Sequence, residues 1–391
     1  MKSQMASILM VHNAYQQRGG EDSVVDAEIK LLRSYGHKVV EYRRSNEELN
    51  QMSRSSAALQ TFWSRGTAHK AAELITLENI DVVHCHNTFP LISPAVYWAA
   101  ARARVPVVQT LHNFRLICPQ ALMLRNEAPC EDCVGHVPWR GVMHGCYRNS
   151  RLQTGILAGM ITAHRVLGTW RDKVTRYIAL NEFCRQKFIQ GGLPADRIVV
   201  KPNFVDAGPA PVRIKRLGAL YVGRLSHEKG ISVLADAMRR LQGRVGLTVV
   251  GVGPQADLLA NLPGVTLLGA LPGNEVMELM RHTQMLVLPS IWYENFPRTL
   301  VEAFGCGLPV VASRLGAMPH LIDHDRNGLL FDAGSVNALA AAMDSLASDP
   351  QRCAEMGLAA RQTYEESLTP EINYKMLMQI YEDALSVPHG L

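Results

Sequence analysis

Short apolar runs alternate with helical stretches along the whole chain, and this alternation constrains the fold more than any other feature. Strands that alternate with helices form parallel sheets covered by helices on both faces, so we predict a doubly wound α/β fold. In the first half the predicted strands are residues 8–11, 38–42, 81–86, 105–111, 177–180 and 198–201, and the predicted helices are residues 22–35, 68–77, 93–103 and 182–191.

The second half repeats this plan after a segment that contains Gly208, Pro209 and Pro211. A chain of 391 residues is comfortable for two such domains. We predict domains over residues 1–204 and 217–369, a linker over 205–216 and a C-terminal helix in 370–391. The predicted strands are residues 219–222, 247–250, 265–268, 285–288 and 309–312, and the predicted helices are residues 230–241, 254–259, 274–282, 298–305, 351–366 and 370–385.

Two carboxylates bracket the turn between the strand 285–288 and the helix 298–305. Glu294 precedes the helix, and Glu302 lies one to two turns inside it. A helix N-terminus offers amide groups and a positive dipole end to a diphosphate, and a carboxylate accepts hydrogen bonds from two neighbouring hydroxyls of a sugar. An exposed helix with acidic residues near its start is the alternative interpretation.

The loop after the strand 219–222 carries two cations. Arg224 and Lys229 flank a short turn in the segment Gly-Arg-Leu-Ser-His-Glu-Lys-Gly. Two such charges at the end of a parallel strand can neutralise a diphosphate. The spacing does not match a P-loop, and a basic surface turn is the alternative.

Two further loops of the first half follow predicted strands. Gly19 and Gly20 precede the first helix, where paired glycines allow a phosphate to approach the backbone, although a simple tight turn has the same sequence. His112 follows the strand 105–111 and is a candidate to orient a sugar hydroxyl. A histidine at such a position is otherwise a structural hydrogen-bonding group.

Together these segments resemble the retaining glycosyltransferases of family 4, which have the GT-B fold of two Rossmann-like domains facing a cleft. The resemblance rests on residues 223–230, on Gly-Val-Gly-Pro at 251–254, and on the Glu-x7-Glu segment followed by Ala-Phe-Gly-Cys-Gly-Leu-Pro-Val-Val-Ala. It covers essentially the whole chain, makes residues 1–204 the acceptor-side domain, and allows the C-terminal helices to cross back to that domain.

The resemblance implies a role for each candidate residue. Arg224 and Lys229 would hold the donor diphosphate, Glu302 the ribose and Glu294 the transferred sugar, with His112 near the reacting carbon. Many relatives have glycine at Pro297, which lacks an amide hydrogen, so backbone contacts would come from neighbouring positions instead. The residues expected to bind the donor are Gly19, Gly20, Arg224, Lys229, Glu294, Asn295, Phe296, Thr299, Leu300 and Glu302, and those expected to act in catalysis are His112, Glu294, Arg224 and Lys229.

The implied reaction transfers a sugar from a nucleotide-diphosphate sugar to a saccharide acceptor with retention at the anomeric carbon. Fixed positive charges stabilise the leaving group, so no cofactor and no catalytic metal is expected. The alternatives are a sugar-nucleotide epimerase or a phosphorylase of the same fold, and a non-catalytic protein that binds sugar nucleotides.

Four cysteines lie close together in the sequence, at Cys118, Cys130, Cys133 and Cys146. This spacing permits a structural zinc site, with His136 and His144 as alternative ligands. Reduced thiols without a metal are the second interpretation.

The acceptor side of the chain is basic. Residues 1–203 carry 25 Lys and Arg against 16 Asp and Glu, and segment 147–177 mixes basic and apolar residues. This pattern suits contact with anionic lipid and a lipid-linked saccharide acceptor in surface polysaccharide assembly, although an ordinary packed helix pair is the alternative. No signal peptide or membrane-spanning run is evident, so we expect a cytoplasmic protein at the inner membrane face. Nucleic acid is not an expected partner, since no matching motif accompanies the charges.

Overall fold

The computed structural model describes residues 5–16, 19–209 and 216–387, and residues 210–215 of the predicted linker lie outside this part of the chain. Two compact units are present. The first unit consists of Met1–Leu122, Glu131–Lys201 and Asn373–Leu391, and the second of Met123–Cys130 and Pro202–Ile372. Each unit is described by itself below.

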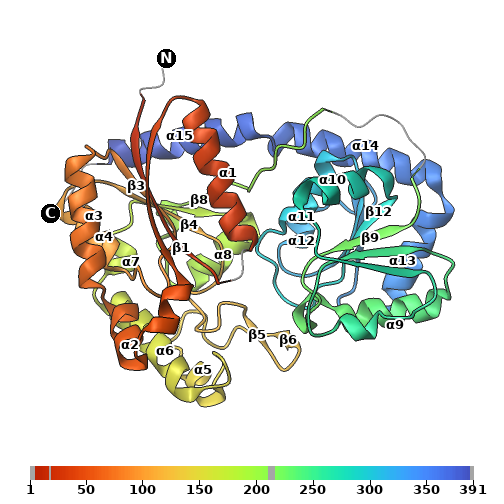
Figure 1. Ribbon diagram of the computed structural model, residues 1–391, viewed down its shortest axis with the longest axis horizontal. Coiled ribbons are helices and arrows are strands. Elements are labelled where there is room, and N and C mark those ends of the chain that lie inside the picture. Colours follow the sequence, from red (N-terminus) through yellow and green to blue (C-terminus); the bar gives the residue numbers. More distant parts are fainter. Residues whose placement is uncertain (1–4, 17–18, 210–215, 388–391) are drawn as a thin grey trace. The chain divides into compact units, whose positions relative to one another are not determined.

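A sheet of six parallel strands forms the centre of the first unit, in the order β2-β1-β3-β4-β7-β8 (Figure 1). The strand order reverses between β1 and β3, and ligands of such sheets bind at the carboxyl ends next to this switch point. The strands are β1 (Ser7–Ala14), β2 (Lys38–Ser45), β3 (Val82–Asn87), β4 (Val107–Leu111), β7 (Arg176–Ala179) and β8 (Ile198–Val200).

Helices connect these strands and cover both faces of the sheet. Among the described residues, no helix is long and apolar enough to span a bilayer. The helices of this unit are α1 (Gly20–Ser34), α2 (Arg54–Phe62), α3 (Arg65–Leu77), α4 (Ala95–Arg102), α5 (Trp139–His144), α6 (Arg151–Val166), α7 (Thr169–Asp172) and α8 (Glu182–Gln190), with the 3-10 helices η1 (Asn46–Gln51) and η2 (Ala195–Arg197).

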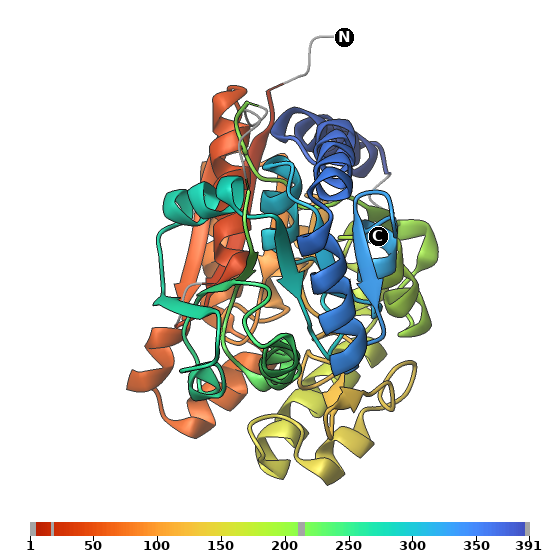
Figure 2. The same ribbon diagram turned by 90° about the vertical axis from the view of Figure 1, so that its right-hand side faces the viewer.

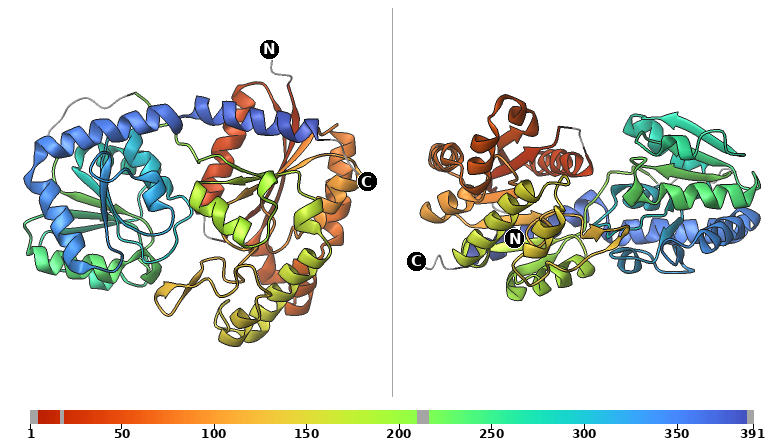
Figure 3. Two further views of the ribbon diagram at one scale, coloured as in Figure 1. Left: turned by 180° about the vertical axis from the view of Figure 1, so that it is seen from behind. Right: turned by 90° about the horizontal axis from the view of Figure 1, so that it is seen from below.

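The last helix, α15 (Pro370–Ser386), belongs to the first unit from residue 373 onward (Figure 3). The C-terminal end of the chain therefore returns to the first unit, as the resemblance allowed. The ring of Tyr374 stacks on Tyr35 with centroids 3.6 Å apart. The hydroxyl of Tyr374 lies 2.8 Å from Nε2 of His37, and that of Tyr381 lies 2.7 Å from Nδ1 of His84. These contacts fix α15 to α1 and to the central strand β3.

Helix α6 packs one face into the core and leaves Leu152 and Val166 exposed, so only part of the apolar set of segment 147–177 is open to a lipid surface. Leu157, Met160, Ile161 and Trp170 are all at most 5% exposed. The alternative of an ordinary packed helix therefore holds for this part of segment 147–177.

The second unit is built on another six-stranded parallel sheet, in the order β11-β10-β9-β12-β13-β14. Numbered within the unit, this is the 3-2-1-4-5-6 order of a dinucleotide-binding fold, with its switch point between β9 and β12. The strands are β9 (Ala219–Val222), β10 (Leu247–Val250), β11 (Val265–Gly269), β12 (Met285–Leu288), β13 (Val310–Ser313) and β14 (Gly328–Phe331).

Helices cover both faces of this second sheet (Figure 2). The segment predicted as a helix at 254–259 is only the 3-10 helix η4 (Ala256–Leu258), and the short hairpin of β5 (Leu124–Arg125) and β6 (Ala128–Pro129) belongs to this unit. Its other helices are η3 (His227–Lys229), α9 (Ile231–Leu241), α10 (Gly273–His282), α11 (Arg298–Gly305), α12 (Met318–Leu321), α13 (Val336–Ser348) and α14 (Pro350–Ser367).

The docking of α15 generates a first prediction. Tyr374→Ala removes the stacked ring and the hydrogen bond to His37, and we expect it to lower the free energy of unfolding by about 3 kcal/mol, as for other buried aromatic truncations. Leu385→Ala on the same helix is the control, because Leu385 is 46% exposed. Urea denaturation of both variants tests this, and equal midpoints for the two would contradict the docking role of Tyr374.

Candidate functional site

The loops after β9 and β12 meet at the switch point of the second sheet. Gly230 has a φ of 72°, and a Cβ atom there would lie 1.9 Å from the carbonyl oxygen of Pro289. The amide of Ile291 donates to the carbonyl of Glu228 at 3.0 Å. Because the two backbones touch, the loops are held in a fixed register, and only glycine fits at position 230.

This register brings Lys229 and Glu294 together. Nζ of Lys229 lies 2.6 Å from Oε1 of Glu294, and the hydroxyl of Ser290 donates to the same oxygen at 2.7 Å. Nζ also lies 5.2 Å from the centroid of the Trp292 ring. Burial acts most strongly and would raise the pKa of Glu294, but the charge of Lys229 and the hydrogen bonds that the carboxylate accepts together outweigh it, so the pKa lies below the usual value.

Lys229 was predicted to bind the diphosphate of the donor and Glu294 its sugar, and these two side chains contact each other directly. Glu294 is only 8% exposed, so its carboxylate depends on Lys229 and Ser290 for compensation. Sequence reasoning did not include Ser290 or Trp292, although both lie in the loop that was singled out.

Helix α11 carries the second carboxylate. Nε of Arg298 lies 3.0 Å from Oε1 of Glu302, one turn further along the helix. Burial raises the pKa of Glu302, and Arg298 offsets this only in part. The pair was not predicted, although an arginine four residues before a glutamate is the signal that could have shown it.

Arg224 is the exposed cation of the site. Its carbonyl accepts a hydrogen bond from the hydroxyl of Tyr221 at 2.9 Å. A Cβ atom on Gly251 would meet the carbonyl oxygen of Gly223, and one on Gly253 that of Leu225. The glycines of the Gly-Val-Gly-Pro segment therefore allow its loop to pack against the loop that carries Arg224.

The other residues near α11 that were predicted to bind the donor differ in solvent exposure. Asn295 and Phe296 are buried, and Thr299 is partly exposed. Leu300 is 0% exposed, and its amide donates to the carbonyl of Pro297 at 3.1 Å. The side chain of Leu300 thus packs in the core and its amide is engaged within the turn, and the donor contact of Leu300 stays a prediction.

Gly19 and Gly20 lie at the start of α1 in the first unit. The amide of Gly19, expected to approach a phosphate, instead donates to Oδ2 of Asp22 at 2.8 Å and so caps the helix. A Cβ atom on Gly20 would meet nothing within 4 Å. Only Gly20 keeps the open approach that the prediction requires.

A polar cluster lies beside these glycines at the carboxyl ends of β1 and β4. The hydroxyl of Tyr15 donates to Oε2 of Glu21 at 3.0 Å and accepts from Nδ2 of Asn113 at 3.4 Å. The guanidinium of Arg115 lies 4.5 Å from the centroid of the Phe89 ring. Burial raises the pKa of Glu21 to about 8. Sequence analysis did not single out these side chains.

His112 follows β4 and contacts a second histidine. Its Nε2 lies 2.8 Å from Nδ1 of His86, and the two rings stack with centroids 5.1 Å apart. Burial and the neighbouring His86 hold the pKa of His112 well below its usual value. His112 is therefore a neutral imidazole near pH 7.

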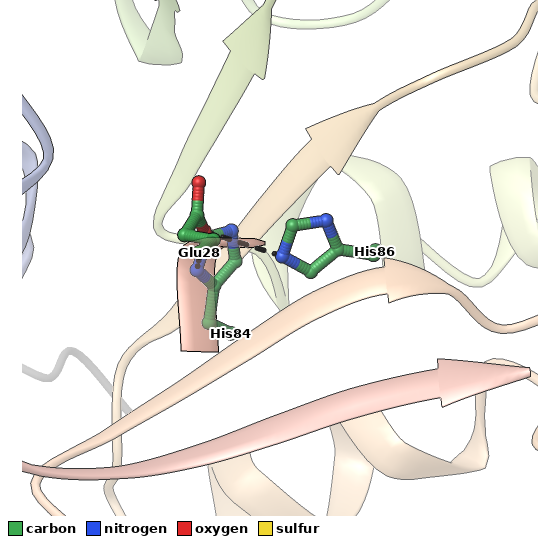
Figure 4. A group of neighbouring side chains, drawn as sticks. All are labelled: Glu28, His84 and His86. Atoms are coloured by element: carbon green, nitrogen blue, oxygen red, sulfur yellow. Dashed lines mark ion pairs between the residues drawn. The ribbon is translucent and has the colours of Figure 1, made fainter. Parts of the chain in front are cut away.

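The four cysteines of the predicted zinc site divide between the units. Cys130 belongs to the second unit, whereas Cys118, Cys133 and Cys146 belong to the first. Among the described residues, the one group of three or more potential ligands within 4.8 Å of one another is Glu28, His84 and His86 (Figure 4). Zinc binding by the cysteines stays a prediction.

Two Rossmann-like units, the second with charged loops at its switch point, define the GT-B class of fold. Family models match both: one described as Glycosyltransferase Family 4 covers residues 19–208, and one described as Glycosyl transferases group 1 covers residues 212–363. The chain belongs to the glycosyltransferases of family 4, as the resemblance predicted.

Individual relatives agree with this assignment. Over 57% of this chain, 30% of residues are identical to the amylovoran biosynthesis glycosyltransferase AmsK of Erwinia amylovora, and over 56%, 30% are identical to a phosphatidyl-myo-inositol mannosyltransferase of Mycobacterium leprae. The matches span 61% of each relative. Among solved structures, Anabaena HepE in complex with UDP aligns with a TM-score of 0.68 at 19% identity, covering 96% of this chain and all of HepE.

The raised pKa of Glu21 generates a second prediction. Since the native state holds a proton on Glu21 up to about pH 8 while the unfolded state loses it near pH 4.5, this group favours folding at low pH and the contribution is lost as the pH rises between these values. Glu21→Gln removes this dependence. We expect the melting temperature of Glu21→Gln, relative to the wild type, to be higher at pH 9 than at pH 5.

The matched control is Glu382→Gln, an exposed glutamate on α15. Differential scanning fluorimetry at both pH values measures the difference. A Glu21→Gln difference that does not change with pH would contradict the raised pKa.

Proposed function

We propose that this protein transfers a sugar from a nucleoside-diphosphate sugar to a saccharide acceptor, with retention of anomeric configuration and without a catalytic metal. The observation that carries the proposal is the contact between Lys229 and Glu294 at the switch point, where ligands of doubly wound sheets bind. The pair joins a cation suited to a phosphate with a carboxylate suited to sugar hydroxyls.

The diphosphate of the donor binds Lys229 and Arg224, near the N-terminus of α11. The ammonium group of Lys229 then donates hydrogen bonds to both Glu294 and the phosphate, which fixes the orientation of the carboxylate relative to the phosphate. Glu302, kept near the N-terminal turn of α11 by Arg298, accepts hydrogen bonds from the ribose hydroxyls. When the sugar leaves, the growing negative charge meets cations that are already in place.

Retention follows from attack on the same face that the leaving group departs from. The acceptor hydroxyl approaches the anomeric carbon, and the departing phosphate oxygen accepts its proton. His112 orients a hydroxyl of the donor sugar during this step. This scheme needs no covalent intermediate and no metal, since Lys229 and Arg224 supply the charge.

UDP is the first nucleotide to test, because HepE is similar in fold and its structure contains UDP. We expect Lys229→Met to weaken UDP binding by about 10- to 100-fold, since a charge-assisted hydrogen bond contributes about 1.5–3 kcal/mol. Lys375→Met, an exposed lysine on α15, removes the same charge and should bind normally. A thermal-shift screen of UDP, GDP, ADP, dTDP and CMP, followed by calorimetry, measures the effect.

Equal affinity of both variants for the nucleotide that binds would sink the proposed donor site. A transfer assay with the matching sugar nucleotide then separates a transferase, which consumes an acceptor, from an epimerase, which does not.

The acceptor is proposed to be lipid-linked, at the cytoplasmic face of a membrane, in exopolysaccharide or glycolipid assembly. AmsK and the phosphatidyl-myo-inositol mannosyltransferase carry names from these two processes. The membrane contact is proposed for α5 and the start of α6 rather than for the buried face of α6. The exposed apolar residues there are Val137, Trp139, Met143 and Leu152, and the exposed cations are Arg140, Arg148 and Arg151.

Exposed tryptophan and methionine beside arginines suit the surface of an anionic bilayer. We expect Trp139→Ser/Met143→Ser to lose most of the binding to vesicles that contain phosphatidylglycerol, as measured by co-sedimentation at low salt. Leu358→Ser, 61% exposed on α14 in the second unit, is the control. Undiminished binding by the double variant would remove this surface from the proposal.

A further inference from the structure

An arginine at the carboxyl edge of the first sheet forms no ion pair with any residue that the structure describes. Arg115 follows β4, and its guanidinium carbon lies 4.5 Å from the centroid of the Phe89 ring and 5.2 Å from that of the Tyr147 ring. Its backbone amide donates to Oδ1 of Asn113 at 3.0 Å, and its guanidinium donates to the carbonyl of Pro119. The side chain is therefore held at both ends, beside two aromatic rings.

Most of the hydrogen-bonding capacity of Arg115 is unused. A guanidinium has five N–H donors, and the bond to Pro119 is the one that this guanidinium makes within the described part of the chain. Arg115 is partly buried, and burial lowers its pKa, although a guanidinium keeps its charge at any physiological pH. A cation that is withdrawn from water in this way is costly unless an anion compensates it.

The carboxyl group beside Arg115 does not supply that anion at neutral pH. The titratable groups whose charges act on Arg115 are Tyr147, Tyr15, Cys118 and Glu21. Burial raises the pKa of Tyr15 well above its usual value and that of Glu21 to about 8. Glu21 is the carboxyl group of this set, and because it carries a proton at pH 7, it does not neutralise Arg115.

A second arginine lies beside the same ring. The guanidinium carbon of Arg148 is 5.3 Å from the centroid of the Tyr147 ring, and Arg148 is exposed and has no carboxylate partner in the described ranges. Arg148 also belongs to the surface proposed above for membrane contact, together with Trp139 and Met143. The arginine at the sheet edge and the proposed membrane surface therefore meet at Tyr147.

The place of these residues in the fold favours a ligand. Tyr15, Phe89 and Arg115 follow β1, β3 and β4, and the order of the strands reverses between β1 and β3. Ligands of doubly wound sheets bind at the carboxyl ends of the strands next to such a reversal. The fork of an arginine matches two oxygens of a phosphate, and two arginines match the charge of the phosphate.

We propose that Arg115, together with Arg148, binds a phosphate group of the acceptor, and that this phosphate joins the saccharide to its lipid. Arg115 binds two of the phosphate oxygens, while Phe89 and Tyr147 hold the plane of its guanidinium in one orientation. The assignment of this phosphate to an acceptor rests on the proposed function, whereas the oxyanion site itself does not. A free phosphate and a lipid-linked phosphate share this chemistry, and a lipid-linked probe distinguishes them.

Nitrogen-15 NMR measures binding at Arg115 itself. Protein labelled in its arginine side chains gives an Nε signal for each arginine, and the signal that is lost in Arg115→Met belongs to Arg115. With UDP present to occupy the proposed donor site, we expect pyrophosphate and geranyl diphosphate to shift this signal and methyl glucoside to leave it unchanged. Arg165 is the matched control, because it is partly buried and donates to the carbonyls of His136 and Gly191, and its signal should not respond.

Two further variants test the set of residues. We expect Arg148→Met to weaken the binding of pyrophosphate, as read from the Arg115 signal, by about 10-fold, the effect of losing one charge-assisted hydrogen bond. Arg102→Met removes an exposed arginine of α4 in the same unit and should leave this affinity unchanged. If Arg115→Met does not fold, Phe89→Leu removes the ring beside the guanidinium and identifies the same signal by its altered shift.

Kinetics test the consequence for the acceptor. In a transfer assay with a saccharide linked to a lipid diphosphate, we expect Arg115→Met to raise the KM for the acceptor by about 10- to 100-fold. The KM for the sugar nucleotide should stay at the wild-type value, since the proposed donor contacts of Arg224 and Lys229 belong to the second unit. An equal rise of both KM values would show that Arg115 supports the fold rather than the acceptor.

The possible results separate the inference from the proposed function. Tighter binding of geranyl diphosphate than of pyrophosphate supports a lipid-linked phosphate, and equal binding would replace it with a free phosphate. An unmoved Arg115 signal, an equal shift of the Arg165 signal, or tighter binding of glucuronate, which offers a carboxylate, would overturn the inference. If Arg115 binds diphosphate in a protein that neither binds UDP nor transfers sugar, the proposed function alone is refuted.

Discussion

Parallel pairing of all strands in both six-stranded sheets is the constraint on which the candidate sites depend. It places the carboxyl ends of the strands at one edge of each sheet, so loops far apart in sequence meet there. In the second unit, β9 and β12 are neighbours although 62 residues separate Val222 from Met285 in the chain numbering. Lys229 and Glu294 meet because these two strands pair, and the contact of Gly230 with Pro289 then sets their distance.

Two lysine–glutamate pairs, one in each unit, follow from this arrangement: Lys201 with Glu28 is buried, and Lys229 with Glu294 is partly buried. A buried ion pair gains little net stability, because the cost of removing both charges from water offsets their attraction. In the proposed function Lys229 and Glu294 present opposite charges to one ligand, whereas Lys201 and Glu28 belong to a buried polar group of the first unit that also contains His84.

Much of the fold could be predicted from the sequence. The strands β9, β10 and β12 and the helix α11 have the predicted bounds, because each is a compact apolar run or a periodic segment with clear ends. Strand β14 and helix α13 were missed. Gly328 opens a run of only four residues, and the alanines of α13 give weak periodicity.

The candidate sites were predictable in part. Four candidate residues could be identified in the loops after strands, because glycines and charged residues stand together there: Arg224, Lys229, Glu294 and Glu302. The buried polar group of Glu28, His84, His86 and Lys201 could not be predicted in the same way. Glu28 and Lys201 are 173 residues apart, and His86 lies in a strand whose residues are all buried, so only the folded sheet brings them together. The burial of Leu300 shows what the sequence could not, since a residue inside a motif can also pack in the core.

The assignment of residues 373–387 to the first unit has a consequence for how the chain is made. Domains usually fold in order as they leave the ribosome. Here the second unit is synthesised in full before Tyr374 and Tyr381 exist to cover α1 and β3. The first unit, whose synthesis begins first, is thus completed last. Until α15 has been synthesised, the part of the sheet around His84 lacks the helix that contacts it. In the nascent chain the residues that α15 later covers therefore stay without this helix for as long as the synthesis of residues 202–372 takes.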